Sequence, residues 1–417
     1  MKTLFQCFKR SGLVLSVLFA VMLFAKQSHG QGTQTFSTAG TFTNGFTVPA
    51  GVSNITVQVW GAGGGAGGGG TNSRGGGGGG AFATTTNIAV TPGQQFTIVV
   101  GAGGTPPASG GNGADGTAGG SSSFGTSVVA AGGSPGQSGG TGGAGGVATS
   151  PSVGATIRAG GNGGNNSSGN GGGGGGQAGC SSAAGNNGGN ATGTPGGIGG
   201  GQTGNIGTCA SVGAGGSGGA TGAAGNSGVA PGGGGGSKGN GSGVASGAGA
   251  SGRVTITWTC PTATISYPSS LFCKAVTTAQ ATINGVGSGT FSSTAGLTIN
   301  SSTGEINPST STSGTYTVHY QFAGGGGCSA IDATATVTIN GTPVTSVTGQ
   351  SDVNCFAGSD GSITIAATGG TAPYFYSVNN GTTWTASASP SPFVYGGLSA
   401  NTQYRIRVKD SNGCLSK

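Results

Sequence analysis

A single block of this chain, residues 61–252, holds 77 of its 103 glycines and limits what the chain can fold into. A collagen triple helix needs glycine at every third position and abundant proline, so runs such as Gly75–Gly80 and only 15 prolines exclude it. A disordered tail usually carries high net charge, whereas charged residues make up 5% of this chain. The composition also argues against an enzyme, because six acidic residues and two histidines offer little catalytic chemistry.

Stretches of β-branched residues recur at four points along the glycine block. All four run straight into small residues: VWGAGG from Val59, VVGAGG from Val99, VVAAGG from Val128 and IRAGGNGG from Ile157. This repetition predicts a β-framework whose strands lead into polyglycine-II-like helices, with about three residues per turn and no internal hydrogen bonds. Such helices lack Cβ atoms, so they can approach closely and bond laterally through N–H and C=O groups.

The ends of the block predict how such a lattice is closed. Val52–Trp60 and Val254–Trp258 alternate like half-buried strands, with Ile55, Val57 and Val59 on one face of the first. We expect these two segments to frame an ordered domain. For residues 160–249 the sequence leaves order and disorder as open alternatives, because ordering glycine costs more entropy than ordering any other residue.

The composition after the glycine block predicts two further β-modules. Threonine, serine, valine and isoleucine dominate from Cys260 onward, and Tyr316–Phe322 alternates inward and outward. Asn380–Gly381 predicts a type I′ turn, and Leu398 followed by Tyr404 is typical of the tyrosine corner of Ig-like sandwiches. The fold class is therefore expected to be all-β: a glycine-rich β-framework domain (31–259), then two Ig-like β-sandwich modules (260–342 and 343–417).

The first thirty residues have the pattern of a secretory signal peptide. Basic residues precede the apolar stretch Leu13–Ala25, and small residues allow cleavage before Gln31; an uncleaved anchor is the alternative. Because Lys2, Lys9, Arg10 and Lys26 leave with this segment, the net charge of +7 falls to +3. We therefore expect a secreted or outer-surface protein with no membrane span after signal removal and no nucleic-acid partner.

Export permits disulfides among the seven cysteines that remain. The sequence favours one bond in the glycine block, Cys180–Cys209, and one within each sandwich, Cys273–Cys328 and Cys355–Cys414. Cys260 is then left over, either free, intermolecular, or competing for Cys273. Connectivity cannot be derived from spacing alone, so these pairs are expectations.

Candidate binding residues are few, and no catalytic constellation is present. Arg405, Arg407 and Lys409 form a basic stripe on one expected strand, which either discourages edge aggregation or contacts a polyanion. Asp360 and Asp410 are expected to form turns first, and a calcium site that uses Asp352, Asp360 or Asp410 is the less favoured alternative. No other metal or cofactor is expected: G-x-G-x-x-A from Gly61 lacks a following helix, and cysteine and histidine spacing does not suit zinc.

Several stretches resemble known families of secreted proteins. FTVPAGVSNITVQVWGAGGGAGG, from Phe46, resembles the opening of bacterial secreted glycine-rich domains, and residues 265–328 resemble an Ig-like module of secreted Bacteroidetes proteins. DVNCFAGSDGSITIAATGGTAPYFYS, from Asp352, is similar to the SprB-type repeat of gliding-motility adhesins. The resemblance implies a modular surface protein, often with a C-terminal sorting domain for type IX secretion. We expect no such domain before Lys417, so the chain is either a fragment or continues past that residue.

Three functional hypotheses follow from these observations. The first is a noncatalytic adhesin or surface-layer protein that gains avidity by multivalent display to extracellular polysaccharide or cell-surface components, with self-association as a further partner expectation. The second is a set of spacer and binding modules of an exported enzyme whose catalytic domain lies beyond residue 417. The third is a structural scaffold without a ligand.

Overall fold

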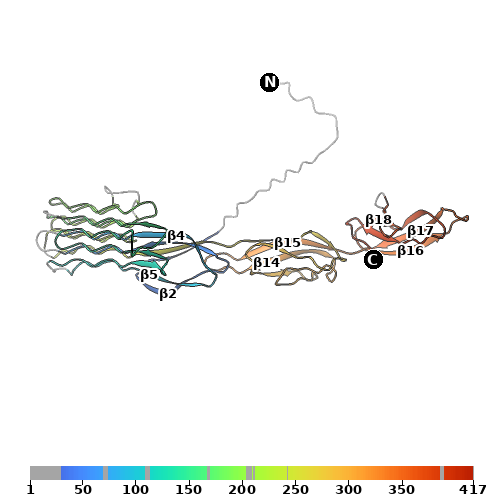
Figure 1. Cartoon of the computed structure of the whole chain (residues 1–417), viewed down its shortest axis with the longest axis horizontal. Coiled ribbons are helices and arrows are strands. Elements are labelled where there is room, and N and C mark those ends of the chain that lie inside the picture. Colours follow the sequence, from blue (N-terminus) through green and yellow to red (C-terminus); the bar gives the residue numbers. More distant parts are fainter. Residues whose placement is uncertain are drawn as a thin grey trace, which may run out of the picture.

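The computed structural model describes residues 30–68, 74–108, 113–166, 170–202, 209, 212–241, 243–385 and 389–416, and the expected signal peptide lies almost wholly outside them. Within these ranges the chain consists of β-strands and extended segments, with no α-helix or 3₁₀-helix. Consequently, none of the described segments is a helix that could cross a bilayer. Figure 1 shows three parts in a line: the glycine-rich domain, a middle sandwich and a third module.

Two sheets form the base of the glycine-rich domain. One sheet has the order β1 (Gln31–Phe36), β9 (Arg253–Thr259), β3 (Asn54–Trp60), β4 (Phe82–Ala89), β8 (Thr156–Arg158). The other has the order β2 (Gly40–Thr47), β5 (Gln95–Val100), β6 (Ser122–Phe124), β7 (Val128–Ala130). The predicted frame is confirmed, because β3 pairs directly with β9 and its inward face, including Val57 and Val59, is fully buried.

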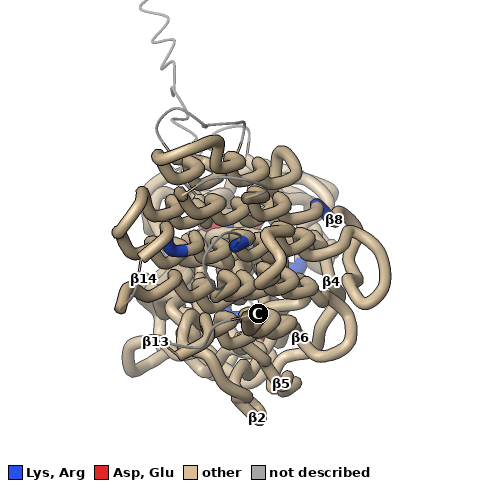
Figure 2. The backbone as a smooth tube through the Cα atoms, turned by 90° about the vertical axis from the view of Figure 1, so that its left-hand side faces the viewer, with Lys and Arg blue, Asp and Glu red and all other residues tan. Residues whose placement is uncertain are grey.

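The glycine segments beyond the sheets form a laterally bonded lattice of polyglycine-II helices. In residues 75–81, successive N–H groups point in turn to three different neighbours and return to the first after three residues. Every third residue donates to the same neighbouring segment. Segment 131–137 accepts from Gly75, Gly78 and Ala81. Segment 161–164 accepts from Gly76 and Gly79, and segment 232–235 accepts from Gly77 and Gly80. This threefold rotation is the signature of a helix with three residues per turn. Seen end-on, the backbone winds in coils stacked in rows, and few positions in this view are coloured as charged residues (Figure 2).

The position of a helix in the lattice decides which residues it can carry. Residues 74–81 and 171–180 have neighbours on all sides and are buried throughout. Helices at the edge lack one neighbour, so every third residue is exposed and bears a side chain, as in TGGAGGV from Thr141. Residues 160–249, for which the sequence left order and disorder open, are thus ordered through most of their described length.

The middle module is a sandwich of a two-stranded and a four-stranded sheet. The first sheet pairs β10 (Ala263–Ser266) with β12 (Thr282–Gly285). The second has the order β11 (Leu271–Cys273), β15 (Ile331–Asn340), β14 (Gly314–Phe322), β13 (Thr290–Ser293). The predicted alternation in β14 is confirmed, since Val318 and Tyr320 are fully buried, while His319 faces outward and pairs with Asp332 at 3.0 Å.

The third module repeats this plan with a smaller core. Its sheets are β16 (Val344–Ser351), β17 (Gly361–Thr368), β19 (Phe393–Leu398), and the pair β18 (Tyr374–Ser377) with β20 (Arg407–Asp410). Asn380 and Gly381 both have positive φ, 59° and 86°, as the predicted type I′ turn requires. The Tyr404 hydroxyl accepts a hydrogen bond from the Ser399 N–H (2.7 Å), which is the upstream backbone contact of a tyrosine corner.

Candidate functional site: cross-linked junctions and a cation–aromatic patch

The described residues contain three disulfides. Cys273–Cys414 joins the middle module to the third, and Cys260–Cys328 ties a turn of the middle module to the boundary residue directly after the last strand of the glycine-rich domain. The bond within the glycine-rich domain, Cys180–Cys209, is the expected one. The expected Cys273–Cys328 and Cys355–Cys414 pairs are wrong, and so is the expectation that Cys260 is unpaired. The bonds found are Cys260–Cys328 and Cys273–Cys414. Of the seven cysteines that the structure describes, Cys355, on an exposed loop, is the free one.

Strand register explains why Cys273 cannot bond to Cys328. Cys273 pairs with Asn340 at one end of β15, whereas Cys328 lies in the turn after Phe322 at the other end of the β14–β15 ladder. That ladder runs for nine residue pairs, so its ends are on the order of 25 Å apart. A disulfide requires Cα atoms about 4.4–6.8 Å apart. Each cysteine therefore faces a different neighbouring module.

The first junction joins the glycine-rich base to the middle sandwich. Cys260 directly follows β9, and its N–H donates to the Gly30 carbonyl beside β1 (2.8 Å). Its partner Cys328 packs against the hydrophobic core of the glycine-rich domain. The turn that carries Cys328 also touches this base, because Gly326 lies against Pro49. The disulfide and this packing together fix the β14–β15 turn to the first domain.

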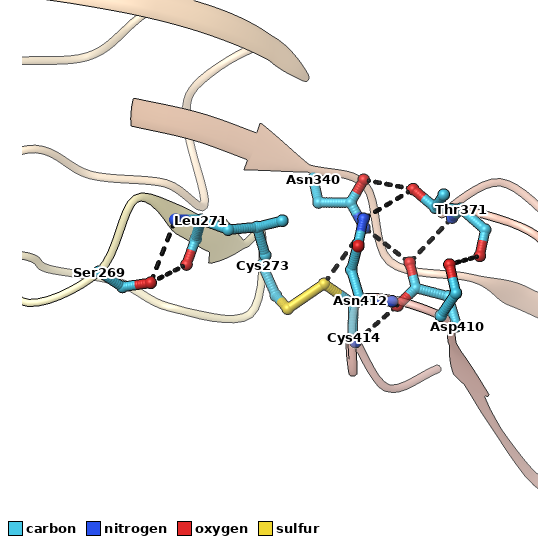
Figure 3. Close-up of a disulfide and its surroundings, with 9 residues drawn as sticks. Ser269, Leu271, Cys273, Asn340, Thr371, Asp410, Asn412 and Cys414 are labelled. Atoms are coloured by element: carbon cyan, nitrogen blue, oxygen red, sulfur yellow. Dashed lines mark hydrogen bonds between the residues drawn. A yellow bond between two sulfur atoms is a disulfide. The ribbon is translucent and has the colours of Figure 1, made fainter. Parts of the chain in front are cut away.

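The second junction combines a disulfide with a buried carboxylate (Figure 3). Asp410, 1% exposed, accepts hydrogen bonds through Oδ2 from Asn340 Nδ2 (2.6 Å) and the Thr371 N–H (2.8 Å). Its Oδ1 accepts from the N–H groups of Asn412 (3.0 Å) and Cys414 (2.8 Å). Asn340 belongs to the middle module and the other four residues to the third. Asp410 therefore acts as a structural acceptor at the junction, in keeping with its expected turn role.

The predicted basic stripe is present on the third module and includes two aromatic rings. On β20, Lys409 pairs across the sheet with Phe375, and its Nζ lies 5.0 Å from the centre of that ring and 4.9 Å from that of Trp384. The Arg407 Nε donates to Asn380 Oδ1 at 3.0 Å. Arg405 is exposed and precedes the strand on the same face. We call Phe375, Trp384, Arg405, Arg407 and Lys409 the cation–aromatic patch.

The aromatic members of this patch were missed in the sequence, although a signal for one exists. Two-residue alternation with antiparallel pairing would place Phe375 beside Lys409 once β18 and β20 are recognised as neighbours. Trp384 lies outside any strand, and its place over Gly381 depends on the type I′ turn. Partly exposed rings beside cations present a flat apolar face together with positive charge. Such a surface suits sugar rings that carry acidic groups.

Two of the three acidic residues considered for calcium, Asp360 and Asp410, have other hydrogen-bond partners in the structure, and Asp352 is exposed. Asp360 accepts hydrogen bonds from the Asn354 N–H (3.2 Å) and Nδ2 (2.5 Å), which lower the pKa of the Asp360 carboxyl. The Asp410 oxygens accept the four junction bonds. Among the described residues, no three histidine, cysteine, aspartate or glutamate side chains gather into a metal-binding group.

Comparison with known families agrees with this architecture. The family described as "Glycine-rich domain" matches residues 37–259, which is more than half of the chain. The SprB repeat matches residues 347–383, from β16 to just past the Asn380–Gly381 turn. A search of curated proteins finds no match. Neither matching description names a catalytic domain, and a SprB repeat together with disulfides is consistent with a cell-surface or secreted protein.

Proposed function

The chain belongs to the glycine-rich domain family, and because it also carries the repeat of gliding-motility adhesins, we propose that it is an exported, noncatalytic surface adhesin. In this proposal the two sandwiches form an arm that holds the glycine-rich domain away from its point of attachment. The glycine-rich domain and the cation–aromatic patch then contact extracellular polysaccharide or neighbouring cells. Repetition of weak contacts over many copies supplies avidity.

The observation that carries this proposal is the pair of disulfides across the junctions. Cys273–Cys414 links two modules and Cys260–Cys328 lies at the boundary of two others, so both bonds restrict bending between modules. A restricted hinge keeps the modules in line, as in Figure 1, and favours transmission of force along the chain. An arm of this kind is useful to an adhesin and has no evident use in a soluble catalyst.

Binding to surfaces tests the proposal. The purified chain, labelled at its free Cys355, is titrated onto whole bacterial cells and onto a panel of immobilised neutral and anionic polysaccharides. We expect saturable binding to at least one of these surfaces. Arg407→Gln and Lys409→Gln, each made singly, should weaken binding to anionic polymers and reduce its salt dependence, while Lys274→Gln, on the middle module, serves as the charge-matched control. If the chain binds saturably to none of these surfaces, the adhesin proposal fails and the scaffold hypothesis replaces it.

A further inference from the structure

The edge of the glycine lattice carries a ladder of asparagine side chains. Asn165 Oδ1 accepts a hydrogen bond from the Gly142 N–H (2.8 Å), and the Asn165 N–H donates to Asn190 Oδ1 (2.8 Å). Each bond joins one polyglycine-II helix to the next. The carboxamides are therefore held in place by the lattice, and their orientation is fixed before any ligand arrives.

The same pattern recurs one helical turn away. The Gly145 N–H donates to Asn162 Oδ1 (2.9 Å), and the Asn162 N–H donates to Asn187 Oδ1 (2.8 Å). The sequence N-G-G-N thus occurs on two adjacent helices, at 162–165 and 187–190, with all four asparagines exposed. Three residues at about 3.1 Å each place equivalent side chains about 9 Å apart along each helix.

This ladder lies in a groove with a volume of about 1040 Å³. Outward residues of the flanking helices supply its apolar parts, among them Ala144, Pro195 and Ile198. Ile198 is 45% exposed although it is a large hydrophobic residue. None of the described residues that line the groove is charged. The groove therefore combines a periodic polar ladder with exposed apolar side chains and carries no charge of either sign.

We propose that this groove binds a neutral, extended polysaccharide of β-1,4-linked hexoses; this inference rests on the proposed adhesive function and names one of its ligands. In such a chain alternate sugar rings are turned over, so its disaccharide repeat has a length similar to the turn of the asparagine ladder. Because the Oδ1 atoms of Asn162, Asn165 and Asn190 already accept lattice N–H groups, these carboxamides offer their Nδ2 hydrogens to sugar hydroxyls. Ile198 and Pro195 contact the apolar faces of the rings. Anionic polymers meet no positive charge in this groove, so we expect them to bind at the cation–aromatic patch instead.

Two substitutions separate the roles of the ladder and of the groove. Asn165→Asp keeps an oxygen acceptor for the Gly142 N–H but removes the Nδ2 donor and adds a negative charge. Ile198→Arg leaves the ladder untouched and fills the groove with a long side chain. Asn226→Asp, on an exposed edge helix outside the groove, is the control for the added charge.

The experiment measures binding of cellohexaose, maltohexaose and a hyaluronan hexasaccharide to the whole chain by titration calorimetry. We expect saturable binding of cellohexaose and weaker binding of the coiled maltohexaose. Asn165→Asp should lower the affinity for cellohexaose about fivefold to tenfold, Ile198→Arg should abolish binding, and Asn226→Asp should change neither. Thermal unfolding of each variant checks that its lattice is intact.

Several outcomes would overturn the inference. One is equal affinity for maltohexaose and cellohexaose, and another is cellohexaose binding that is unchanged in Ile198→Arg. If the chain binds cells but not cellohexaose, the adhesive function stands and the groove ligand is wrong; if it binds no cell or polymer, the adhesive function itself fails. If Ile198→Arg dissociates an oligomer in sedimentation and leaves sugar binding unchanged, the groove is an interface between copies.

Discussion

Gly163 offers a direct test of the lattice. Its N–H donates to the Gly143 carbonyl (2.8 Å), and a Cβ at this position would overlap the Gly76 carbonyl oxygen, which itself accepts the Gly143 N–H (2.8 Å). Gly163→Ala must therefore push two backbones apart, for which overpacking typically costs about 1–3 kcal/mol. The loss of unfolded-state entropy on replacing glycine offsets about 0.4–1 kcal/mol of this. We expect a net destabilisation of about 1–2 kcal/mol.

The assay is thermal unfolding of the glycine-rich domain, followed by the fluorescence of Trp60 and Trp258 with Trp384 replaced by phenylalanine in every variant. For a domain of this size, each kcal/mol corresponds to about 2–4 °C, so Gly163→Ala should lower the midpoint by about 2–8 °C. Gly139→Ala is the matched control, because its Cβ would meet no atom within 4 Å. That variant should raise the midpoint by about 1–4 °C. A Gly163→Ala protein as stable as Gly139→Ala would refute close packing of these helices.

Four further predictions follow from the junctions and the third module. Alkylation of the oxidised chain should modify Cys355 and spare Cys260, as peptide mass spectrometry would show; the reverse result would contradict the disulfide pairing. Replacing Cys273 and Cys414 with serine should destabilise the chain by up to about 5 kcal/mol in the chain-entropy model and increase the bending seen by small-angle scattering. Asp410→Ala leaves four hydrogen-bond donors without their acceptor and should cost about 3 kcal/mol or more in denaturant unfolding, whereas exposed Asp352→Ala should cost little. Asn354→Ala should raise the pKa of Asp360 toward its usual value, measured by NMR titration, because the Asn354 bonds that favour the carboxylate are gone.

Local pattern was enough to predict the strands and the glycine helices. Alternation around Val57 marks one face of β3, and β3, β5 and β7, which end at Trp60, Val100 and Ala130, lead into small residues where the chain leaves a sheet. These features depend on neighbours in sequence, so they can be read from the chain directly. The threefold exposure pattern of the edge helices is visible in the same way, as in N-G-G-N from Asn162.

The disulfides and the binding residues depend on contacts that sequence spacing does not encode. Cys273 and Cys328 bracket one module, but the β14–β15 register separates them by the length of that module, and Cys414 reaches Cys273 because β20 ends at the junction. The ladder was missed for a similar reason. Asn165 and Asn190 become neighbours only when two edge helices align, and glycine helices with nearly identical sequences do not specify which of them lie side by side.

The lattice also explains why its surface carries amides rather than charges. At an edge helix some N–H groups have no backbone acceptor, and a carboxamide Oδ1 on the adjacent helix supplies one, as Asn165 does for Gly142. A carboxylate could accept the same bond. However, Asn165 and Asn190 lie on adjacent helices, joined by the hydrogen bond from the Asn165 N–H to Asn190 Oδ1, so carboxylates at both positions would repel each other. We therefore expect Asn165→Asp alone to be tolerated and the Asn165→Asp, Asn190→Asp double variant to lose more stability than the sum of the two single losses, with the excess reduced by salt. Additive losses of stability in denaturant unfolding would mean that the two helices are not close neighbours in solution. The groove would then lack the asparagine ladder.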